Sequence, residues 1–314
     1  MAMSVAAVTK GLPREEWLKL RTRGIGGSDA AAVVGMNPWK SKVAVFLEKT
    51  GQIQPEQSGE AAYWGTTLED VVAKEFTLRT GVKAQRSNKL YQHPEHPFMI
   101  GNVDRLVTDN NKRRGILEVK TTSAYKASDW EGESIPDHYA IQLQHYMAVL
   151  GVDYGHFAVL IGGNQFIHRY VERDDRVIKY LIEMEAHFWK EHVLKNNPPM
   201  IDGSAASTEL LSYLYPTSKP DSVVQLTSDY EDRVKELREA QEAAKAADER
   251  LEAAKNYIKA AAGDAETILL NGDKVATWKS NETTSLDTKR LKAERPEIYA
   301  EYAKTSTVRR FLIK

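Results

Sequence analysis

The chain has 314 residues, 42% of them apolar, which is enough for one domain of ordinary size and a smaller second unit. It has no cysteine, which excludes disulfides, iron–sulfur clusters and thiolate zinc sites, so a bound metal must be held by oxygen or imidazole. A formal net charge of −1 argues against a protein that coats nucleic acid through an overall positive surface, so a nucleic-acid ligand would need a local basic patch.

Four helices are predicted in the first eighty residues. They cover residues 15–21, 30–34, 41–49 and 63–80, with Ser28 as N-cap of the second helix and Gly81 as the end of the fourth. The fourth helix repeats apolar residues at helical spacing and carries Glu69 in its first half. Extended runs follow at residues 83–91, 98–108 and 115–120, which predicts a three-stranded meander.

A further helix and a hairpin are predicted after the meander. Pro136 can begin a helix that continues to Leu150 and ends at Gly151. Strands are expected at residues 155–161 and 165–171, and an amphipathic helix at 177–194. This order of elements indicates an α+β fold, with a central mixed β-sheet flanked by helices, over residues 1–200.

The last third of the sequence has a different character. Residues 201–227 are expected to be a linker, and 228–314 a C-terminal helical unit. From Leu237 to Ala261, apolar residues recur alternately three and four positions apart, which predicts a long helix with a coiled-coil seam. Asn271-Gly272 between two extended runs predicts a β-hairpin. Two short helices and a final strand at 307–313 would complete a small αβ unit.

Two acidic residues and a lysine are predicted to meet on neighbouring strands. Asp104 precedes Glu118-Val119-Lys120 by fourteen residues. Since alternate residues of a strand share a face, Glu118 and Lys120 point to one side and Val119 to the other. Two carboxylates suit a Mg²⁺ ion, and a lysine beside it can orient or deprotonate the attacking water. Taken alone, Glu-x-Lys also fits a surface strand with a salt bridge.

Five separated segments strengthen the catalytic interpretation. They are Trp17-Leu18-Lys19-Leu20-Arg21, Gly24-Ile25-Gly26-Gly27-Ser28-Asp29-Ala30, Trp64-Gly65 with Glu69, Asp104 with Glu118-Val119-Lys120, and Tyr139 with Ile141-Gln142-Leu143-Gln144. In order and spacing they resemble the lambda exonuclease and YqaJ-type phage recombinase nucleases of the PD-(D/E)XK superfamily. The resemblance covers about residues 15–195 and implies a restriction-endonuclease-like core. Val103 stands where the pattern usually has proline, which supplies no ligand.

The resemblance implies a metal site. Asp104, Glu118 and the backbone carbonyl of Val119 would bind Mg²⁺, for which Mn²⁺ could substitute. Glu69 would contribute through the metal's water. Lys120 would position or activate the nucleophilic water.

The resemblance also implies supporting and DNA-binding residues. Gln142 and Tyr139, one helical turn apart, would assist at the active site. Arg21, Ser28 and Lys126 would contact the terminal 5′-phosphate of DNA. A serine among exposed N–H groups at a helix N-terminus fits an anion contact, and it equally fits a plain helix cap.

The activity that the resemblance implies is a Mg²⁺-dependent 5′-to-3′ exonuclease on linear double-stranded DNA. It would leave 3′ overhangs for a single-strand annealing recombinase in phage-type recombination. Lambda-type members form a trimer around the duplex, which implies a homo-oligomer. With no apolar run of membrane-spanning length and no secretory signal, we expect a cytoplasmic protein without a membrane partner. The alternatives are an endonuclease with the same chemistry and a non-catalytic DNA-binding or assembly module.

Overall fold

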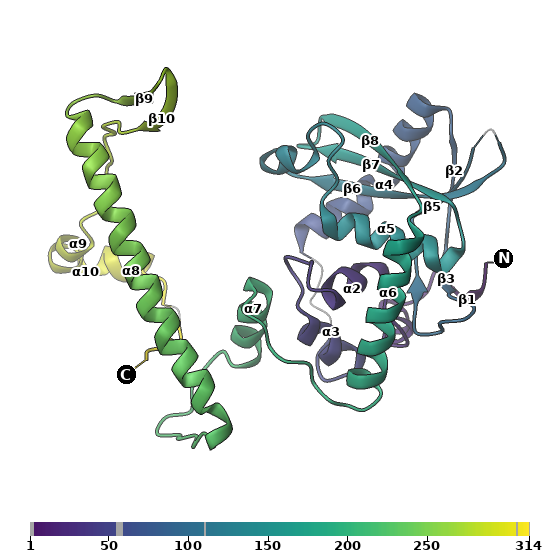
Figure 1. The fold of residues 1–314 in the computed structure, drawn as a ribbon, viewed down its shortest axis with the longest axis horizontal. Helices are drawn as coiled ribbons and strands as arrows, with labels where there is room; N and C mark the ends of the chain where they lie inside the picture. The colour runs from purple at the N-terminus through teal and green to yellow at the C-terminus, as the bar shows by residue number, and fades with distance from the viewer. Residues whose placement is uncertain (1–2, 55–58, 110, 306, 314) are drawn as a thin grey trace. The chain divides into compact units, whose positions relative to one another are not determined.

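The computed structural model describes residues 3–54, 59–109, 111–305 and 307–313. The chain divides into two compact units, Met1–Leu214 and Tyr215–Lys314, which are described separately. Figure 1 shows the elements of both units along the chain. Among the helices of the described residues, none has the length and apolar character needed to cross a membrane.

A five-stranded sheet forms the centre of the first unit (Figure 1). Its strands, in spatial order, are β2 (Lys83–Arg86), β5 (Arg105–Thr108), β6 (Arg114–Thr122), β7 (Tyr154–Ile161) and β8 (Gln165–Glu172). β6 and β7 are parallel and the other neighbours are antiparallel. The parallel pair requires a crossover, which helix α5 (Asp137–Leu150) provides. The predicted α+β fold with a central mixed sheet is confirmed.

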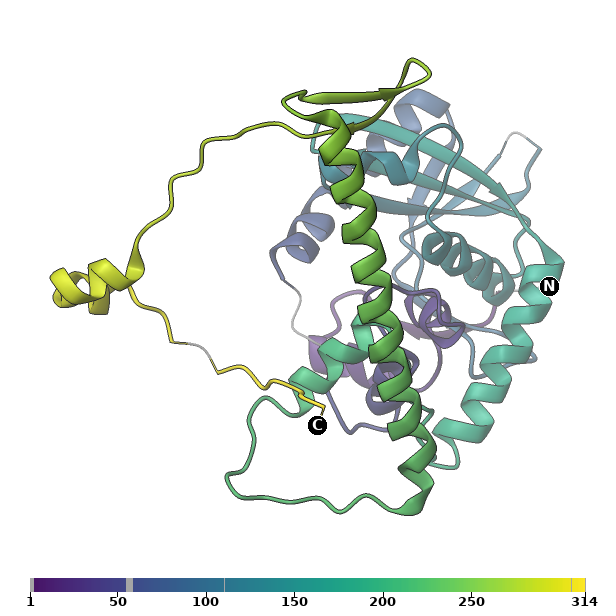
Figure 2. The ribbon, with the colours of Figure 1, turned by 60° about the vertical axis from the view of Figure 1, so that its left-hand side comes forward.

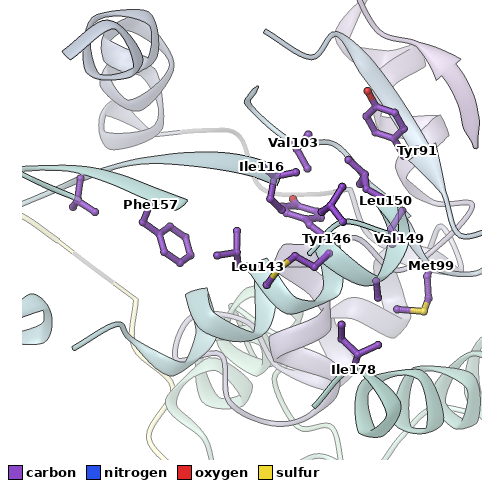
Figure 3. Close-up of a cluster of buried hydrophobic side chains, with 14 of the residues drawn as sticks. Tyr91, Met99, Val103, Ile116, Leu143, Tyr146, Val149, Leu150, Phe157 and Ile178 are labelled. Atoms are coloured by element: carbon purple, nitrogen blue, oxygen red, sulfur yellow. The ribbon is translucent and has the colours of Figure 1, made fainter. Parts of the chain in front are cut away.

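Helices cover both faces of the sheet. On one face, Leu143 of α5 lies in the same buried cluster as Ile116 of β6 (Figure 3). On the other face, Phe76 of α4 (Glu60–Thr80) clusters with Leu117 and Val119 of β6. Since side chains alternate along a strand, even-numbered residues of β6 face α5 and odd-numbered residues face α4.

Three short helices stand near the N-terminus of the chain, and the second of them packs against α5. They are α1 (Arg14–Arg21), α2 (Gly27–Val33) and α3 (Lys42–Lys49). A second buried cluster joins α2 and α3 to α5 and to α6 (Asp175–Phe188), with Phe46 and Leu181 among its members. α6 continues into a π-helical turn, Trp189–Val193, and a 3₁₀ helix, Ala124–Trp130, lies between β6 and α5.

Two of the predicted extended runs are interrupted, and a second sheet results. Run 83–91 forms β2 and β3 (Lys89–Gln92), and run 98–108 forms β4 (Ile100–Gly101) and β5. β3 and β4 join β1 (Val5–Val8) in a separate three-stranded sheet. At the break, the N–H of Ser87 donates to the carbonyl of Asp104 at 3.1 Å. Each run therefore crosses from one sheet to the other, and a continuous strand at either place was a wrong prediction.

Residues 201–227 were expected to be a linker, but α7 (Ala205–Leu214) lies there and is grouped with the first unit. Ala206 and Leu210 of this helix are buried. Its short apolar stretch gave too little periodicity to distinguish it from a loop.

The second unit contains the predicted long helix and hairpin. After a 3₁₀ turn (Ser228–Tyr230), α8 (Glu231–Ala262) is one uninterrupted helix, drawn in green in Figure 2. β9 (Thr267–Leu270) and β10 (Asp273–Thr277) turn at Asn271 and Gly272, which have φ values of 53° and 92°. α9 (Thr288–Glu294) and α10 (Pro296–Tyr302) follow. The predicted strand at 307–313 is wrong, because that segment has no strand partner among the described residues.

A fully buried polar contact joins α5 to α6. His145 Nδ1 lies 2.8 Å from Glu185 Oε1, and His145 Nε2 lies 2.9 Å from the carbonyl oxygen of Ile100. Burial raises the pKa of the Glu185 carboxyl. Burial alone would lower the pKa of His145, but Glu185 and its hydrogen bond raise it. The pair therefore depends on both partners being present.

Replacing Glu185 with leucine should lower the free energy of unfolding by about 3 kcal/mol or more, because a buried imidazole loses its partner. Urea unfolding of the full chain measures this loss. Asp175→Ala is the control, since it breaks an ion pair with Arg173 in which the Asp175 side chain is 80% exposed, and it should change stability little. Equal small losses in both variants would contradict a structural role for the buried pair.

Candidate metal and catalytic site

Asp104, Glu118 and Lys120 lie together where β5 begins beside β6. Asp104 Oδ2 accepts a hydrogen bond from the backbone N–H of Val119 at 2.8 Å. The backbone N–H of Asp104 points to Glu118 Oε1 at 3.4 Å, and Lys120 Nζ donates to Glu118 Oε2 at 3.1 Å. The structure thus brings together the three side chains that the sequence pattern singled out.

Helix α5 supplies the wall facing these residues. Gln142 Nε2 lies 3.4 Å from Glu118 Oε2 and 3.3 Å from the hydroxyl of Tyr146. Lys120 Nζ lies 5.0 Å from the centre of the Tyr139 ring, a cation–π contact. Gln142 therefore orients the glutamate, and Tyr139 orients the lysine.

The two carboxylates have too little positive charge around them. Burial raises the pKa of Glu118 to about 8, and the charge of Asp104 adds to this rise against the opposing effect of Lys120. Burial also raises the pKa of Asp104, where Lys120 opposes the rise and Glu69 adds to it. Burial alone would lower the pKa of Lys120, but the two carboxylates raise it. The ammonium of Lys120 thus offsets part of the negative charge of both carboxylates, which are removed from water.

This donor set fits a hard divalent cation. Carboxylate oxygens are the ligands that Mg²⁺ prefers, and a cation would relieve the repulsion between Asp104 and Glu118. The N–H and C=O of one strand residue point to the same edge, so the carbonyl of Val119 lies on the edge where its N–H meets Asp104. Among the described residues no group of three or more acidic or histidine side chains could hold a metal. Further ligands would therefore be this carbonyl and water.

Glu69 lies on α4 and pairs with arginines. Its Oε1 accepts hydrogen bonds from Nη1 of Arg105 and, at 3.1 Å, from Nη2 of Arg86. The hydrogen bonds of the described residues do not join Glu69 to Asp104 or Glu118. Arg105 was not singled out from the sequence, because nothing local marks it as the buried partner of a glutamate 36 positions away.

Arg21 and Ser28 meet beside the N-terminus of α2. Arg21 Nη2 donates to Ser28 Oγ at 3.0 Å. Ser28 as N-cap was a wrong prediction: α2 begins at Gly27, its N-cap is Gly26, and Asp29 Oδ2 accepts from the Gly26 N–H at 3.2 Å. The aspartate one position later performs the capping, so the exposed Ser28 hydroxyl remains directed at the guanidinium.

Asp29 gathers the cations of this region, a role that sequence reasoning missed. Its carboxylate lies 2.7 Å from Lys49 Nζ, 2.9 Å from Lys40 Nζ and 3.8 Å from Arg21 Nη2. Lys40 also pairs with Glu48 at 2.5 Å. Burial alone would raise the pKa of Asp29, but Lys40, Lys49 and Arg21 hold it well below its ordinary value. The cluster contains three positive side chains (Arg21, Lys40 and Lys49) and two negative ones (Asp29 and Glu48), so it carries one net positive charge.

Tyr146 forms a wall shared by the cationic group and the carboxylates. A Cβ on Gly27 would come within 2.6 Å of its ring, so only glycine allows α2 to approach this closely. Burial raises the pKa of Tyr146, the charge of Glu118 adds to the rise, and Arg21 opposes it. Figure 3 shows this ring beside Ile116, on the sheet side of α5.

Lys126 lies apart from Arg21 and Ser28. It belongs to the 3₁₀ helix Ala124–Trp130, its side chain is 60% exposed, and its Nζ is 3.8 Å from Asp129. Among the described contacts none joins it to the other two predicted phosphate contacts.

Known proteins that are similar to this chain identify its fold and its family. The chain is similar to the alkaline exonuclease LHK-Exo of Laribacter hongkongensis, with a TM-score of 0.50 and 22% identity over 58% of this chain and 94% of that one. The two proteins share a fold over this range. Residues 16–153 match the YqaJ-like viral recombinase domain, and the YqaJ protein of Bacillus subtilis (strain 168) is 40% identical over 313 residues, 99% of this chain and 97% of that protein. The chain belongs to the YqaJ-like viral recombinase family, which confirms the resemblance.

Asp29→Asn should destabilise the protein at pH 7 by about 3 kcal/mol or more, because Lys49 is 2% exposed and would lose its counter-charge. A lowered folded-state pKa adds stability above the unfolded-state pKa, and that stability is lost as the pH falls through the folded-state value. The difference from wild type should therefore be constant from about pH 7 to 5 and narrow below about pH 4.

Urea unfolding across this pH range makes the measurement. Glu48→Gln is the control, because it removes only the outer partner of Lys40 and should cost less. A difference for Asp29→Asn that did not change with acidification would contradict the charge assignment.

Proposed function

We propose that this protein is a Mg²⁺-dependent exonuclease that degrades one strand of linear double-stranded DNA from its 5′ end. The observation that carries the proposal is the junction of β5 and β6, where Asp104, Glu118 and Lys120 share hydrogen bonds. Membership of a recombinase family and a fold shared with an alkaline exonuclease support DNA as the substrate. Metal-dependent hydrolysis uses acidic ligands that hold the ion next to the attacking water, and Asp104 and Glu118 can supply them.

In the proposed reaction Asp104, Glu118 and the carbonyl of Val119 would hold the divalent ion, Mg²⁺ or Mn²⁺. When bound, the ion would polarise the phosphodiester and lower the pKa of its water. Lys120 donates a hydrogen bond to the attacking water or to the charge that develops on the phosphate. Gln142 keeps the Glu118 carboxylate in place during this step.

Three further residues would support the reaction without binding the metal directly. Tyr139 limits the positions that Lys120 can take, through the contact of the ammonium with its ring. Glu69 holds Arg105 at the start of β5 and thereby steadies the strand end that carries Asp104. A water-mediated contribution of Glu69 to the metal is part of the proposal, and Lys126 is included as a further, peripheral contact to DNA.

End recognition distinguishes the exonuclease from an endonuclease. Arg21 and Ser28 offer a guanidinium fork and a hydroxyl to a terminal 5′-phosphate, and Arg21 belongs to the cluster that carries one net positive charge. The ring of Tyr146 packs against Gly27 next to this cluster, and Tyr146 is close enough to Glu118 for the charge of the glutamate to raise its pKa. The same carboxylates would serve an endonuclease, but that activity needs no end-binding group.

The biological setting follows from the family resemblance. The 3′ overhang would pass to a single-strand annealing recombinase in the cytoplasm of a bacterial host. A ring of three copies around the duplex would keep the enzyme on its substrate. A non-catalytic DNA-binding module remains the competing function, and the loss of cleavage in site variants separates the two.

Lys120→Ala and Asp104→Asn should each lower the rate of DNA hydrolysis by at least about 100-fold, because each removes a group needed in the transition state. Release of nucleotides from end-labelled linear duplex with Mg²⁺ measures the rate, and circular dichroism checks the fold. Lys179→Ala removes an exposed lysine of α6 and should leave the rate unchanged. Near-normal cleavage by either site variant would show that hydrolysis occurs elsewhere.

Linear duplex with a 5′-phosphate should be degraded faster than duplex with a 5′-hydroxyl, and covalently closed plasmid should stay intact. Arg21→Ala should reduce the preference for the phosphate roughly tenfold while retaining the rate on 5′-hydroxyl ends, since it removes a charged hydrogen-bond donor. Parallel time courses on the three substrates make the comparison. Cleavage of the closed circle would favour the endonuclease.

A further inference from the structure

Helix α8 has an apolar seam that none of the described residues of its own unit buries. It runs for 32 residues, about 48 Å, and none of its residues is buried. Most helices in proteins are stabilised by packing an apolar face rather than by propensity alone. The seam consists of Leu237, Ala240, Ala244, Ala247, Leu251, Ala254, Ile258 and Ala261. Its strict alternation of three and four is the pattern of a coiled coil.

The sizes of the seam residues indicate how a partner helix would lie. One set, Leu237, Ala244, Leu251 and Ile258, contains all the large side chains, and the other set is alanine throughout. A parallel pair would place like sets together, so that leucine meets leucine and alanine meets alanine. An antiparallel pair of identical helices places each large seam residue of the overlap opposite an alanine, so that no layer contains two large residues. We propose that α8 pairs antiparallel with α8 of a second copy of this chain, which in the proposed ring of three copies would belong to another ring.

One register pairs the seam of both copies from Ala244 to Ala261 and leaves Leu237 and Ala240 beyond the overlap. Leu251 lies opposite Ala254 of the second copy, and Ile258 lies opposite Ala247 of the second copy. By symmetry each contact occurs twice. The two-fold axis then passes between residues 252 and 253.

Charges beside the seam favour this register over its neighbours. Asp248 comes beside Lys255 of the second copy, and Arg250 comes beside Tyr257, whose side chain is 81% exposed in the single chain. A shift of one heptad that uses the full seam would instead place Asp248 against Asp248 and Arg250 against Arg250. A parallel pair would place Arg250 against Lys255. Both alternatives oppose like charges, so the antiparallel register with Leu251 opposite Ala254 is the complementary one.

The absence of native cysteine allows a direct test by disulfide formation in the full chain. In the variant Ala247→Cys with Ile258→Cys, the two thiols of one helix are about 16 Å apart and cannot bond to each other. The antiparallel register brings each thiol to the other copy. Mild oxidation should therefore give a covalent dimer on a non-reducing gel, at least about tenfold faster than either single variant.

Matched variants decide between the alternatives. Glu249→Cys with Asn256→Cys carries thiols on the opposite face of α8 and should dimerise slowly. Ile258→Cys alone would dimerise rapidly in a parallel pair, and Ala240→Cys with Ile258→Cys in the shifted register; either outcome overturns the proposal. An unlinked monomer in every variant, with circular dichroism unchanged, also overturns it.

Charge exchange provides a test without cysteine. Asp248→Lys should weaken self-association of the full chain in sedimentation velocity, and Asp248→Lys combined with Lys255→Asp should restore it. Failure of the combined variant to recover, with α8 still helical, would contradict the register. The proposal is independent of nuclease activity, and these measurements do not use it.

Discussion

The hydrogen bond from the N–H of Val119 to the carboxylate of Asp104 is the constraint on which the candidate site depends. Pairing between β5 and β6 ends at Arg105 and Leu117, so the next N–H group that β6 directs to that edge has no strand partner. Asp104 takes the place of the missing strand. The end of a β-ladder thus becomes a site, because a carboxylate satisfies the backbone donor and the carbonyl beside it stays available to a ligand.

The two clusters of the first unit use buried acids in opposite ways. Asp29 is surrounded by three cations, so its pKa falls and the cluster keeps a net positive charge. Glu118 has one ammonium shared with Asp104, so its pKa rises and the pair attracts a further cation. The first arrangement suits an anion, and the second suits a metal. The contrast follows from the number of positive charges around each carboxylate, not from the residue type.

The position of a side chain could be predicted where it depends only on the repeat of a single strand or helix. The two-residue repeat placed Glu118 and Lys120 on one face of β6, and the helical turn placed Tyr139 and Gln142 on one side of α5. The order and type of the main elements followed from the same periodicities. The wrong strand over residues 307–313 shows the limit, because strand propensity needs a pairing partner that the sequence does not reveal.

Long-range polar partners could not be predicted. Asp29 meets lysines 11 and 20 positions away, Arg105 meets Glu69 36 positions away, and no local pattern marks either pairing. The capping prediction failed for a related reason. Ser28 and Asp29 both suit the start of a helix, but Ser28 lies inside α2, where its hydroxyl accepts from Arg21, and Asp29 accepts from the N–H of Gly26.

Tyr146 shows how packing can set the geometry of the proposed reaction. Its ring fills the space that the missing side chain of Gly27 leaves, and its hydroxyl contacts Gln142, which contacts Glu118. Each link is buried or short, so the separation between the Arg21 group and the carboxylates is set by the core and not by a loop. An enzyme that binds a terminal phosphate and cuts at a fixed distance from it needs this kind of rigid spacing. On the proposed function, Tyr146 is a positioning residue that helps to fix the distance between Arg21 and the carboxylates, and it is not itself a proposed ligand of the metal or the phosphate.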